Sequence, residues 1–386
     1  MSKYVIEDVT LTAIADAVRE KTGGTELILV SELPTAIAGI EGGGGNAPTA
    51  EELTFTGSIN NLFAYGTWNW FIEKYKDDIL FQNITSSQNM FNQNSTIKEL
   101  GSLTIPFVKA NTYNMFGYCQ QLTSLPSVSG TWSKYFSGLF MGCHSLPSDE
   151  INAFFANLTV DPSDTNNQFH SMFQSCRSVR DLTPALEWVH ANINNNDTMN
   201  LSTHLQNMFN GCYVLDSLEN VPVIYRGSSS TSRTTNAFNS TFADCGRVKD
   251  VIFATDNGTP YVVRLGNQTI DLSYYVGYHA TETNFTNYGI TSDKKVSSSA
   301  TYAALKDDPD WYAVQQAYSR YNHDSAVRTI NSLPDTSAFL STNSTYTNTI
   351  KFKGASGSMT DGGAINTLTE EEIAVATAKG WTVTLV

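Results

Sequence analysis

One pattern of apolar positions recurs along the chain between about residues 86 and 255. Each copy has a Phe, preceded by an apolar residue in five of the six copies, then Cys (Asn in the first copy) three residues later, then one or two aliphatic residues at further steps of three. The six pairs of Phe and Cys-position residues are Phe91 with Asn94, Phe116 with Cys119, Phe140 with Cys143, Phe173 with Cys176, Phe209 with Cys212, and Phe242 with Cys245. The intervals between copies vary, while the apolar pattern itself is kept.

This pattern predicts stacked coils. One coil of this size cannot bury its Phe, Cys and Leu alone, whereas stacking aligns these residues into continuous internal rows. We therefore expect an α/β repeat fold, an elongated, right-handed leucine-rich-repeat solenoid with short strands and helical turns. Each aliphatic pair, such as Leu122 and Leu125, should mark a strand, and insertions on one side of the coils should account for the variable intervals.

A short attachment segment is expected ahead of the repeats. Apolar residues at helical spacing in residues 10–21, and again from Ser31, predict two short amphipathic helices. Two helices of this length cannot form a core, so we interpret residues 1–41 as a helical attachment or oligomerisation segment. The glycine-rich run at 42–50 predicts a flexible linker to a solenoid over residues 51–255.

Two further segments follow the solenoid. Residues 256–340 depart from the pattern, are rich in Tyr and are expected to form an irregular insertion that contains a helix. Residues 341–386 are expected to supply a last repeat and a cap. Within them, Thr369 and Glu372 form a predicted capping box that starts a helix. Gly380 should end this helix, and the alternating residues after it predict a strand.

Composition and charge exclude several classes of function. Only 16% of residues are charged and 41% are hydrophobic, which favours a folded chain over a disordered acidic one. The formal net charge is −14 and no basic run occurs, which argues against nucleic acid as a partner. No apolar stretch approaches the roughly 20 residues that span a bilayer. The first residues do not resemble a secretory signal, so we expect synthesis in a bacterial cytoplasm without export.

The five cysteines all occupy the same position of the repeat. Stacked coils place equivalent residues about 4.8 Å apart, whereas a disulfide needs Cβ atoms about 3.8 Å apart. Free, buried thiols are therefore favoured over disulfides or a metal site, and Asn94 in the same row agrees with an inward-facing side chain.

Recognisable catalytic chemistry is absent from the sequence. The six histidines are scattered, and no metal-binding spacing occurs among them. Cys143 beside His144 is better explained by the repeat than as a nucleophile and its base. Acidic pairs such as Asp149 and Glu150 could cleave glycans in principle, but such pairs are mostly solvated surface. We expect no catalytic residue, no metal and no cofactor.

Aromatic side chains in and after the repeats are candidates for stacking on sugar rings. For each of them, burial in the core is the alternative interpretation. The candidates for surface binding are Trp188, Tyr274, Tyr275, Tyr278 and Trp311.

The Phe-x-x-Cys-x-x-aliphatic pattern, present at five places, resembles the bacterial-surface-antigen (BspA-like) class of leucine-rich repeat. Residues 11–40 resemble segments of tail and minor structural proteins of phages that infect Gram-positive hosts. Residues 63–75 resemble the first coil of phage-encoded arrays of this kind. The resemblance leaves residues 254–340 unmatched, and the chain departs from the cellular family in lacking export and wall-anchoring signals.

The resemblance implies a bacteriophage virion protein, a tail fibre or receptor-binding protein that contacts the host surface through its solenoid. The alternatives are a structural baseplate or tail-decoration subunit, and a glycan depolymerase. The expected partners are other tail or baseplate proteins, through residues 1–41, and a glycan or protein of the host surface. We also expect a homo-oligomer, for instance a trimer, whose several copies would bind together.

Overall fold

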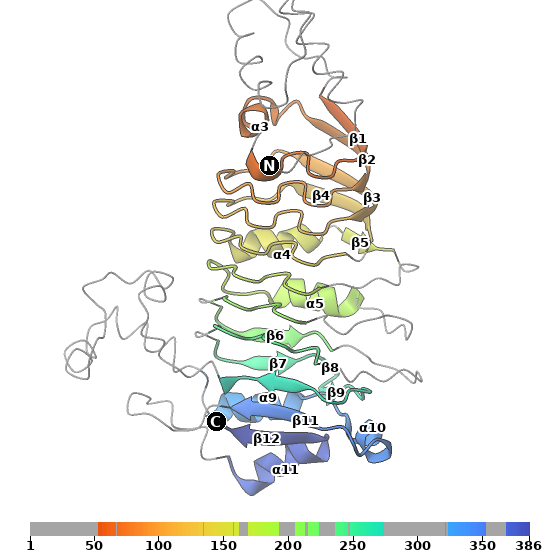
Figure 1. Cartoon of the computed structure of the whole chain (residues 1–386), viewed down its shortest axis with the longest axis vertical. Coiled ribbons are helices and arrows are strands. Elements are labelled where there is room, and N and C mark those ends of the chain that lie inside the picture. The colour runs from red at the N-terminus through yellow and green to blue at the C-terminus, as the bar shows by residue number, and fades with distance from the viewer. Residues whose placement is uncertain are drawn as a thin grey trace, which may run out of the picture.

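The computed structural model describes the chain from residue 53 onward, with gaps. The described ranges are 53–66, 68–133, 135–156, 158–161, 169–192, 205–212, 215–223, 236–245, 248–273, 321, 323–352 and 368–386. The expected attachment segment (1–41) and linker (42–50) lie outside them, as do residues 274–320 of the expected insertion. The described part is elongated, with β1 near one end and α11 at the other (Figure 1).

A five-stranded parallel sheet forms the first part of the stack, in the order β1-β2-β3-β4-β5. Its strands are β1 (Thr54–Ser58), β2 (Leu80–Ser86), β3 (Thr104–Asn111), β4 (Ser127–Trp132) and β5 (Leu158–Val160). In β3 the side chains of Ile105, Phe107 and Ala110 are buried, whereas Thr104 and Val108 are exposed. One face of the sheet therefore packs on the core and the other faces outward.

The remaining described strands form three smaller sheets. They are the parallel pair β6 (Leu218–Val221) and β7 (Val251–Phe253), the antiparallel pair β8 (Thr255–Asp256) and β9 (Thr259–Pro260), and the parallel sheet of β10 (Thr269–Asp271), β11 (Asn348–Phe352) and β12 (Trp381–Leu385).

The expected leucine-rich-repeat solenoid is therefore wrong as a description of the fold. The described residues form a mixed α/β fold with separate sheets of five, three, two and two strands. The strands do not fall on the aliphatic pairs either: Leu122 and Leu125 precede β4, and next to them only the isolated bridge between Glu99 and Ser124 occurs. The longer intervals between repeats contain helices, one between β4 and β5 at Ser148–Ala156 and one after β5 at Thr183–Asn192, where the five-stranded sheet ends.

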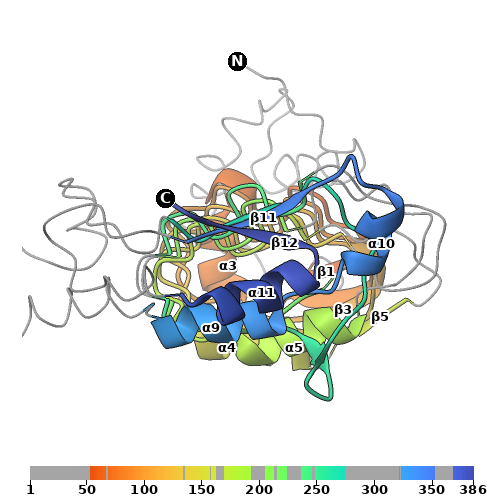
Figure 2. The same ribbon diagram turned by 90° about the horizontal axis from the view of Figure 1, so that it is seen from below.

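Six α-helices lie in the described residues. They are α3 (Asn69–Tyr75), α4 (Ser148–Ala156), α5 (Thr183–Asn192), α9 (His323–Ser332), α10 (Ser337–Thr342) and α11 (Glu370–Ala378). Along the long axis, α4, α5 and α9 overlap on one side of the molecule (Figure 2). Helix α4 buries Ile151, Phe154 and Phe155 on one face, which is the side that packs on the stacked core.

Seven short segments, here called the Phe turns, lie over one another beside the strands (Figure 1). They are residues 59–66, 87–94, 112–119, 136–143, 169–176, 205–212 and 238–245. In each turn the second residue before the central Phe and the second residue after it have positive φ angles. Only the first turn contains a 3₁₀ segment, at Ala64–Gly66, and the described residues of the other six form hydrogen-bonded turns instead of the expected helical ones.

Backbone hydrogen bonds join each Phe turn to the next. The N–H of Phe91 donates to the carbonyl of Met115 at 2.8 Å, and the N–H of Phe116 donates to the carbonyl of Leu139 at 3.0 Å. The two left-handed residues of each of the first six turns donate in the same way, so three columns of peptide groups run from turn to turn along the stack. These bonds satisfy backbone groups that would otherwise be buried without partners.

A helix and a strand close the described stack at its C-terminal end. Thr369 and Glu372 form both hydrogen bonds of a capping box at the start of α11, which confirms the sequence prediction. Helix α11 ends at Ala378, and Gly380, with φ +83, leads into β12. The indole N–H of Trp381 donates to the carbonyl of Pro334 at 2.8 Å, so this end is tied to the chain ahead of α10.

Candidate binding face

The central Phe residues of the Phe turns form one continuous column inside the molecule. Neighbouring rings lie 5.4–6.1 Å apart between centroids, and their planes are within 22° of parallel. The column consists of Phe63, Phe91, Phe116, Phe140, Phe173, Phe209 and Phe242. All seven rings are buried, so they stabilise the stack and are not accessible to a ligand.

The residues three positions after each Phe form a second buried column. All five cysteines are free and buried, and each thiol donates to the carbonyl of the Phe one turn earlier. Asn94 makes the equivalent bond, because its side-chain N–H donates to the Phe63 carbonyl at 3.1 Å. This position thus requires a small side chain that donates a hydrogen bond, which both Cys and Asn provide. The residues are Asn94, Cys119, Cys143, Cys176, Cys212 and Cys245.

The buried thiols are expected to be unreactive in the folded protein. Burial raises the pKa of Cys143 to about 12 and that of Cys212 to about 12, so both remain protonated at neutral pH, and the thiolate is the reactive form. We expect a thiol reagent at about pH 8 to label none of the five cysteines in the native chain. In denaturant it should label all five. Rapid labelling of the native protein, or fewer than five thiols after unfolding, would contradict this structure.

The aromatic residues expected to bind at the surface are only partly described. Trp188, in α5, is half-buried: its ring packs on Phe155 at 5.0 Å and its indole N–H donates to the Leu158 carbonyl. It therefore belongs to the aromatic core around Trp132 and Phe136. The other four candidates, Tyr274, Tyr275, Tyr278 and Trp311, lie outside the described residues.

The outer side of the Phe turns carries a different pair of aromatic residues, Tyr65 and Tyr118, which sequence reasoning missed. Both occupy the second position after the central Phe, and their side chains are 49% and 43% exposed. Their φ angles are 62° and 61°, a backbone conformation that is rare for a bulky residue. The only signal in the sequence was their fixed distance from Phe63 and Phe116, which did not reveal the backbone conformation.

The Phe turns are also free of charge. The first six contain no Asp, Glu, Lys or Arg, and the seventh contains only Asp244. Because the whole chain carries a formal net charge of −14, its acidic residues must lie on other parts of the molecule. Within these turns Gln93 is an exposed amide, and the residues directly after the turns include the exposed Ser95 and Gln120 as well as the charged Arg177.

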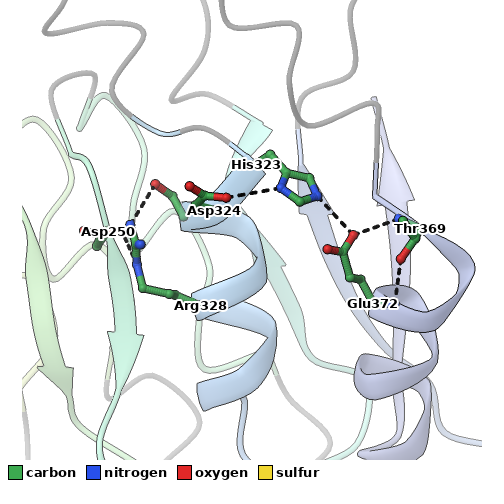
Figure 3. A network of polar contacts seen from close by, with 7 residues as sticks. Asp250, His323, Asp324, Arg328, Thr369 and Glu372 are labelled. Carbon is green, nitrogen blue, oxygen red and sulfur yellow. Dashed lines mark hydrogen bonds and ion pairs between the residues drawn. The ribbon is translucent and has the colours of Figure 1, made fainter.

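A polar network at the C-terminal end contains an imidazole and carboxylates, groups that also occur in catalytic sites (Figure 3). Nε2 of His323 lies 3.1 Å from Oε2 of Glu372, and Nδ1 lies 3.4 Å from Asp324. The same Glu372 oxygen accepts the Thr369 backbone N–H. Both imidazole nitrogens thus contact carboxylates, and no thiol or hydroxyl nucleophile is hydrogen-bonded to His323 among the described residues. The network joins the start of α9 to the start of α11.

A second ion pair in the same region holds α9 from its other side. The guanidinium of Arg328 donates to Asp250 through Nε, at 3.0 Å, and through one terminal nitrogen. Asp250 lies just before β7 and is largely buried, so its charge is compensated by Arg328. This ion pair links α9 to the start of β7 and is structural rather than catalytic.

The contact between His323 and Glu372 predicts a pH dependence of stability. The hydrogen bond to Glu372 raises the pKa of His323. The contribution of the protonated imidazole to the stability of the fold is therefore present at low pH and is lost as the pH rises through that raised pKa. The Thr369 backbone N–H, together with His323, lowers the pKa of Glu372, so its contribution is lost as the pH falls through that lowered pKa. The contact is therefore strongest between the ordinary pKa values of the two groups.

We expect His323→Gln, which keeps a hydrogen-bonding group but no charge, to lower the urea midpoint more at about pH 5.5 than at about pH 8. Asp78→Asn, on an exposed residue outside the network, serves as the control and should lower neither midpoint. An equal loss at both pH values in His323→Gln would show that the charge of the imidazole does not matter.

The part of the chain that the structure describes contains no candidate metal site and no candidate membrane-spanning helix. No three His, Cys, Asp or Glu side chains gather there closely enough to hold a metal ion. None of the helices in the same ranges is both long and apolar enough to span a bilayer. Comparison with protein-family models, with curated proteins and with solved structures found no match for this chain.

Proposed function

We propose that this protein is a non-enzymatic structural and adhesive component of a bacteriophage tail, which contacts the host cell through the outer side of its Phe turns. The observation that carries the proposal is the exposure of Tyr65 and Tyr118 on Phe turns that contain no charged residue, in an otherwise acidic chain. Aromatic rings beside amides and hydroxyls are typical of surfaces that bind neutral polar ligands.

The buried chemistry supports an adhesive rather than an enzymatic role. The groups most able to act as nucleophiles, the five thiols, are all buried and donate hydrogen bonds to backbone carbonyls. His323 is held between two carboxylates. Because these groups stabilise the stack, they favour a rigid protein that binds through its surface over an enzyme.

The assignment to a phage tail rests on the resemblance of residues 11–40 to tail-protein segments. In this proposal residues 1–41 join the protein to other tail or baseplate proteins, and identical copies lie side by side in the virion. Several weak contacts with one cell surface then act together, because each bound copy raises the effective concentration of the others.

Adsorption to cells tests the proposal directly. Fluorescently labelled full-length protein is mixed with a panel of Gram-positive strains, and bound protein is measured after washing. We expect saturable binding to some strains, inhibition by unlabelled protein, and no release of reducing ends from cell-wall polysaccharide. Binding to no strain would overturn the adhesive role, and release of reducing ends would identify a depolymerase instead.

A purely structural role in the baseplate or tail is the second candidate, and the C-terminal end of the stack favours it. Strand β12 pairs with β11 on one edge only among the described residues; Leu385, its last residue, and Val386 after it are 41% and 55% exposed. An open strand edge with apolar side chains can pair with another protein. Tight binding to purified tail components without any binding to cells would support this role.

A further inference from the structure

Tyr65 and Tyr118 hold a backbone position that disfavours them. Left-handed φ angles suit Gly and Asn, and a bulky residue in this region is strained. At the same position of other Phe turns the chain has Gly142 and Gly211, which bear no such strain, and the polar residues Gln93, Ser175 and Asp244. Because both tyrosines are also substantially exposed, core packing does not explain them. A role at the surface does.

The two tyrosines lie in one line along the stack. Gln93 occupies the equivalent position in the Phe turn between them. Neighbouring rings of the Phe column are 5.4 and 5.6 Å apart over this stretch, so Tyr65 and Tyr118 are separated by about 11 Å. Three consecutive sugar rings of one linear chain can span this distance, the two outer rings on Tyr65 and Tyr118 and the middle ring opposite Gln93.

The ring of Tyr118 is held against the surface by Gly142. A Cβ atom built on Gly142 would come within 2.7 Å of Cδ1 of Tyr118, so the ring lies directly over the glycine of the next turn. Its other side is available to a ligand, in agreement with its exposure of 43%. A flat, fixed aromatic ring loses little conformational entropy when a sugar stacks on it.

The absence of charged residues from the Phe turns of Tyr65 and Tyr118 limits the ligands that these turns can bind. Phosphate or sulfate groups would require Arg or Lys, and a basic partner would require carboxylates. The turns that carry both tyrosines have neither, whereas Gln93, Gln120 and Gln121 are exposed amides that can bind hydroxyl groups.

We propose that Tyr65 and Tyr118, with Gln93 between them, form a binding strip for a neutral, linear polysaccharide that lies along the long axis of the stack. This inference rests on the proposed adhesive function and specifies its ligand class. A polyanionic polysaccharide is excluded by the same charge argument, since the strip has no cation to bind it and the chain is acidic overall.

Affinity gel electrophoresis of the full-length protein tests the strip. The probes are a soluble neutral β-glucan, a soluble neutral galactan and, as the polyanionic probe, polygalacturonate. We expect retardation by at least one neutral polymer and none by polygalacturonate. Tyr118→Asn should weaken the retardation about tenfold, while Tyr118→Trp should keep it.

Tyr118→Asn also separates function from stability. Asn suits the left-handed backbone better than Tyr, so the melting temperature should stay the same or rise while binding is lost. Val108→Ala, at an exposed apolar residue on β3, is the control and should bind like the wild type. Retardation that Tyr118→Asn leaves unchanged, or retardation by polygalacturonate alone, overturns the strip.

Adsorption to cells, run on the same variants, distinguishes the two proposals. If the wild type binds cells but neither neutral polymer, and Tyr118→Asn still binds cells, the adhesive function stands and the strip is wrong. If the wild type binds neither cells nor polymers, both proposals fail. If Tyr118→Asn loses both kinds of binding and keeps its melting temperature, both are supported.

Discussion

Replacing Phe140 with alanine is expected to destabilise the protein by about 3–5 kcal/mol. Its ring is completely buried in the middle of the Phe column, between Phe116 at 5.7 Å and Phe173 at 6.1 Å. Phe154 of α4 also packs edge-on against it at 5.4 Å. Alanine would leave a cavity that neighbouring turns cannot fill, because their positions are fixed by backbone hydrogen bonds to one another.

Urea unfolding followed by circular dichroism measures this loss. Because stacked units couple mainly to their neighbours, the transition of Phe140→Ala should also become broader as the two halves of the stack separate. Val108→Ala removes a smaller apolar group from an exposed site and should change stability by less than about 0.5 kcal/mol. A loss of similar size in both variants would mean that the ring column does not stabilise the fold.

Replacing Gly130 with alanine is the second large effect that we expect, about 3 kcal/mol or more of destabilisation. Gly130 lies in β4 with φ +93, opposite Phe107 of β3. A Cβ atom at this position would come 2.1 Å from the Phe107 carbonyl oxygen. Since that oxygen is backbone, it cannot move away without opening the pairing between the two strands.

Gly57→Ala is the matched control for this prediction. Gly57 also has positive φ and lies in the same sheet, but a Cβ atom there would meet nothing within 4 Å. Gly57→Ala should therefore lower the free energy of unfolding only by the backbone strain, about 1 kcal/mol. In thermal melts, Gly130→Ala should have a clearly lower melting temperature than Gly57→Ala. Equal melting temperatures would show that the close approach between β3 and β4 is absent in solution.

The inner columns of the stack followed from the sequence more directly than its outer layers did. Phe and Cys recur at fixed spacing because each turn must place them in contact with the same residues of the next turn, as the bonds from Cys143 to Phe116 and from Cys176 to Phe140 show. The capping box of α11 was also predictable, since Thr369 and Glu372 interact locally.

The arrangement of the sheets was not predictable in the same way. Strands were expected on aliphatic pairs such as Leu122 and Leu125, yet β4 begins only at Ser127. The sheet ends at β5, and the next described element is the helix α5. Apolar spacing alone does not distinguish such a helix from another strand. The single solenoid sheet expected from the repeats was therefore wrong.

The candidate site was missed for a different reason. Trp188 was predicted as an aromatic side chain that could stack on a sugar ring, and it is half-buried in the aromatic core. Tyr65 and Tyr118 owe their exposure to left-handed backbone angles, which depend on the hydrogen bonds between turns. Sequence spacing identifies the position of these residues within the turn but not the direction in which the backbone presents them.

The three columns of hydrogen-bonded peptides give the stack an electrical polarity. Every N–H in a column points toward the C-terminal end and every carbonyl toward the N-terminal end, so the peptide dipoles add, as they do in an α-helix. The carbonyls of Asn60, Leu62 and Ala64 therefore concentrate partial negative charge at one end, and the last Phe turn carries partial positive charge at the other. Cations should be favoured near the first end and anions near the second, in every copy alike.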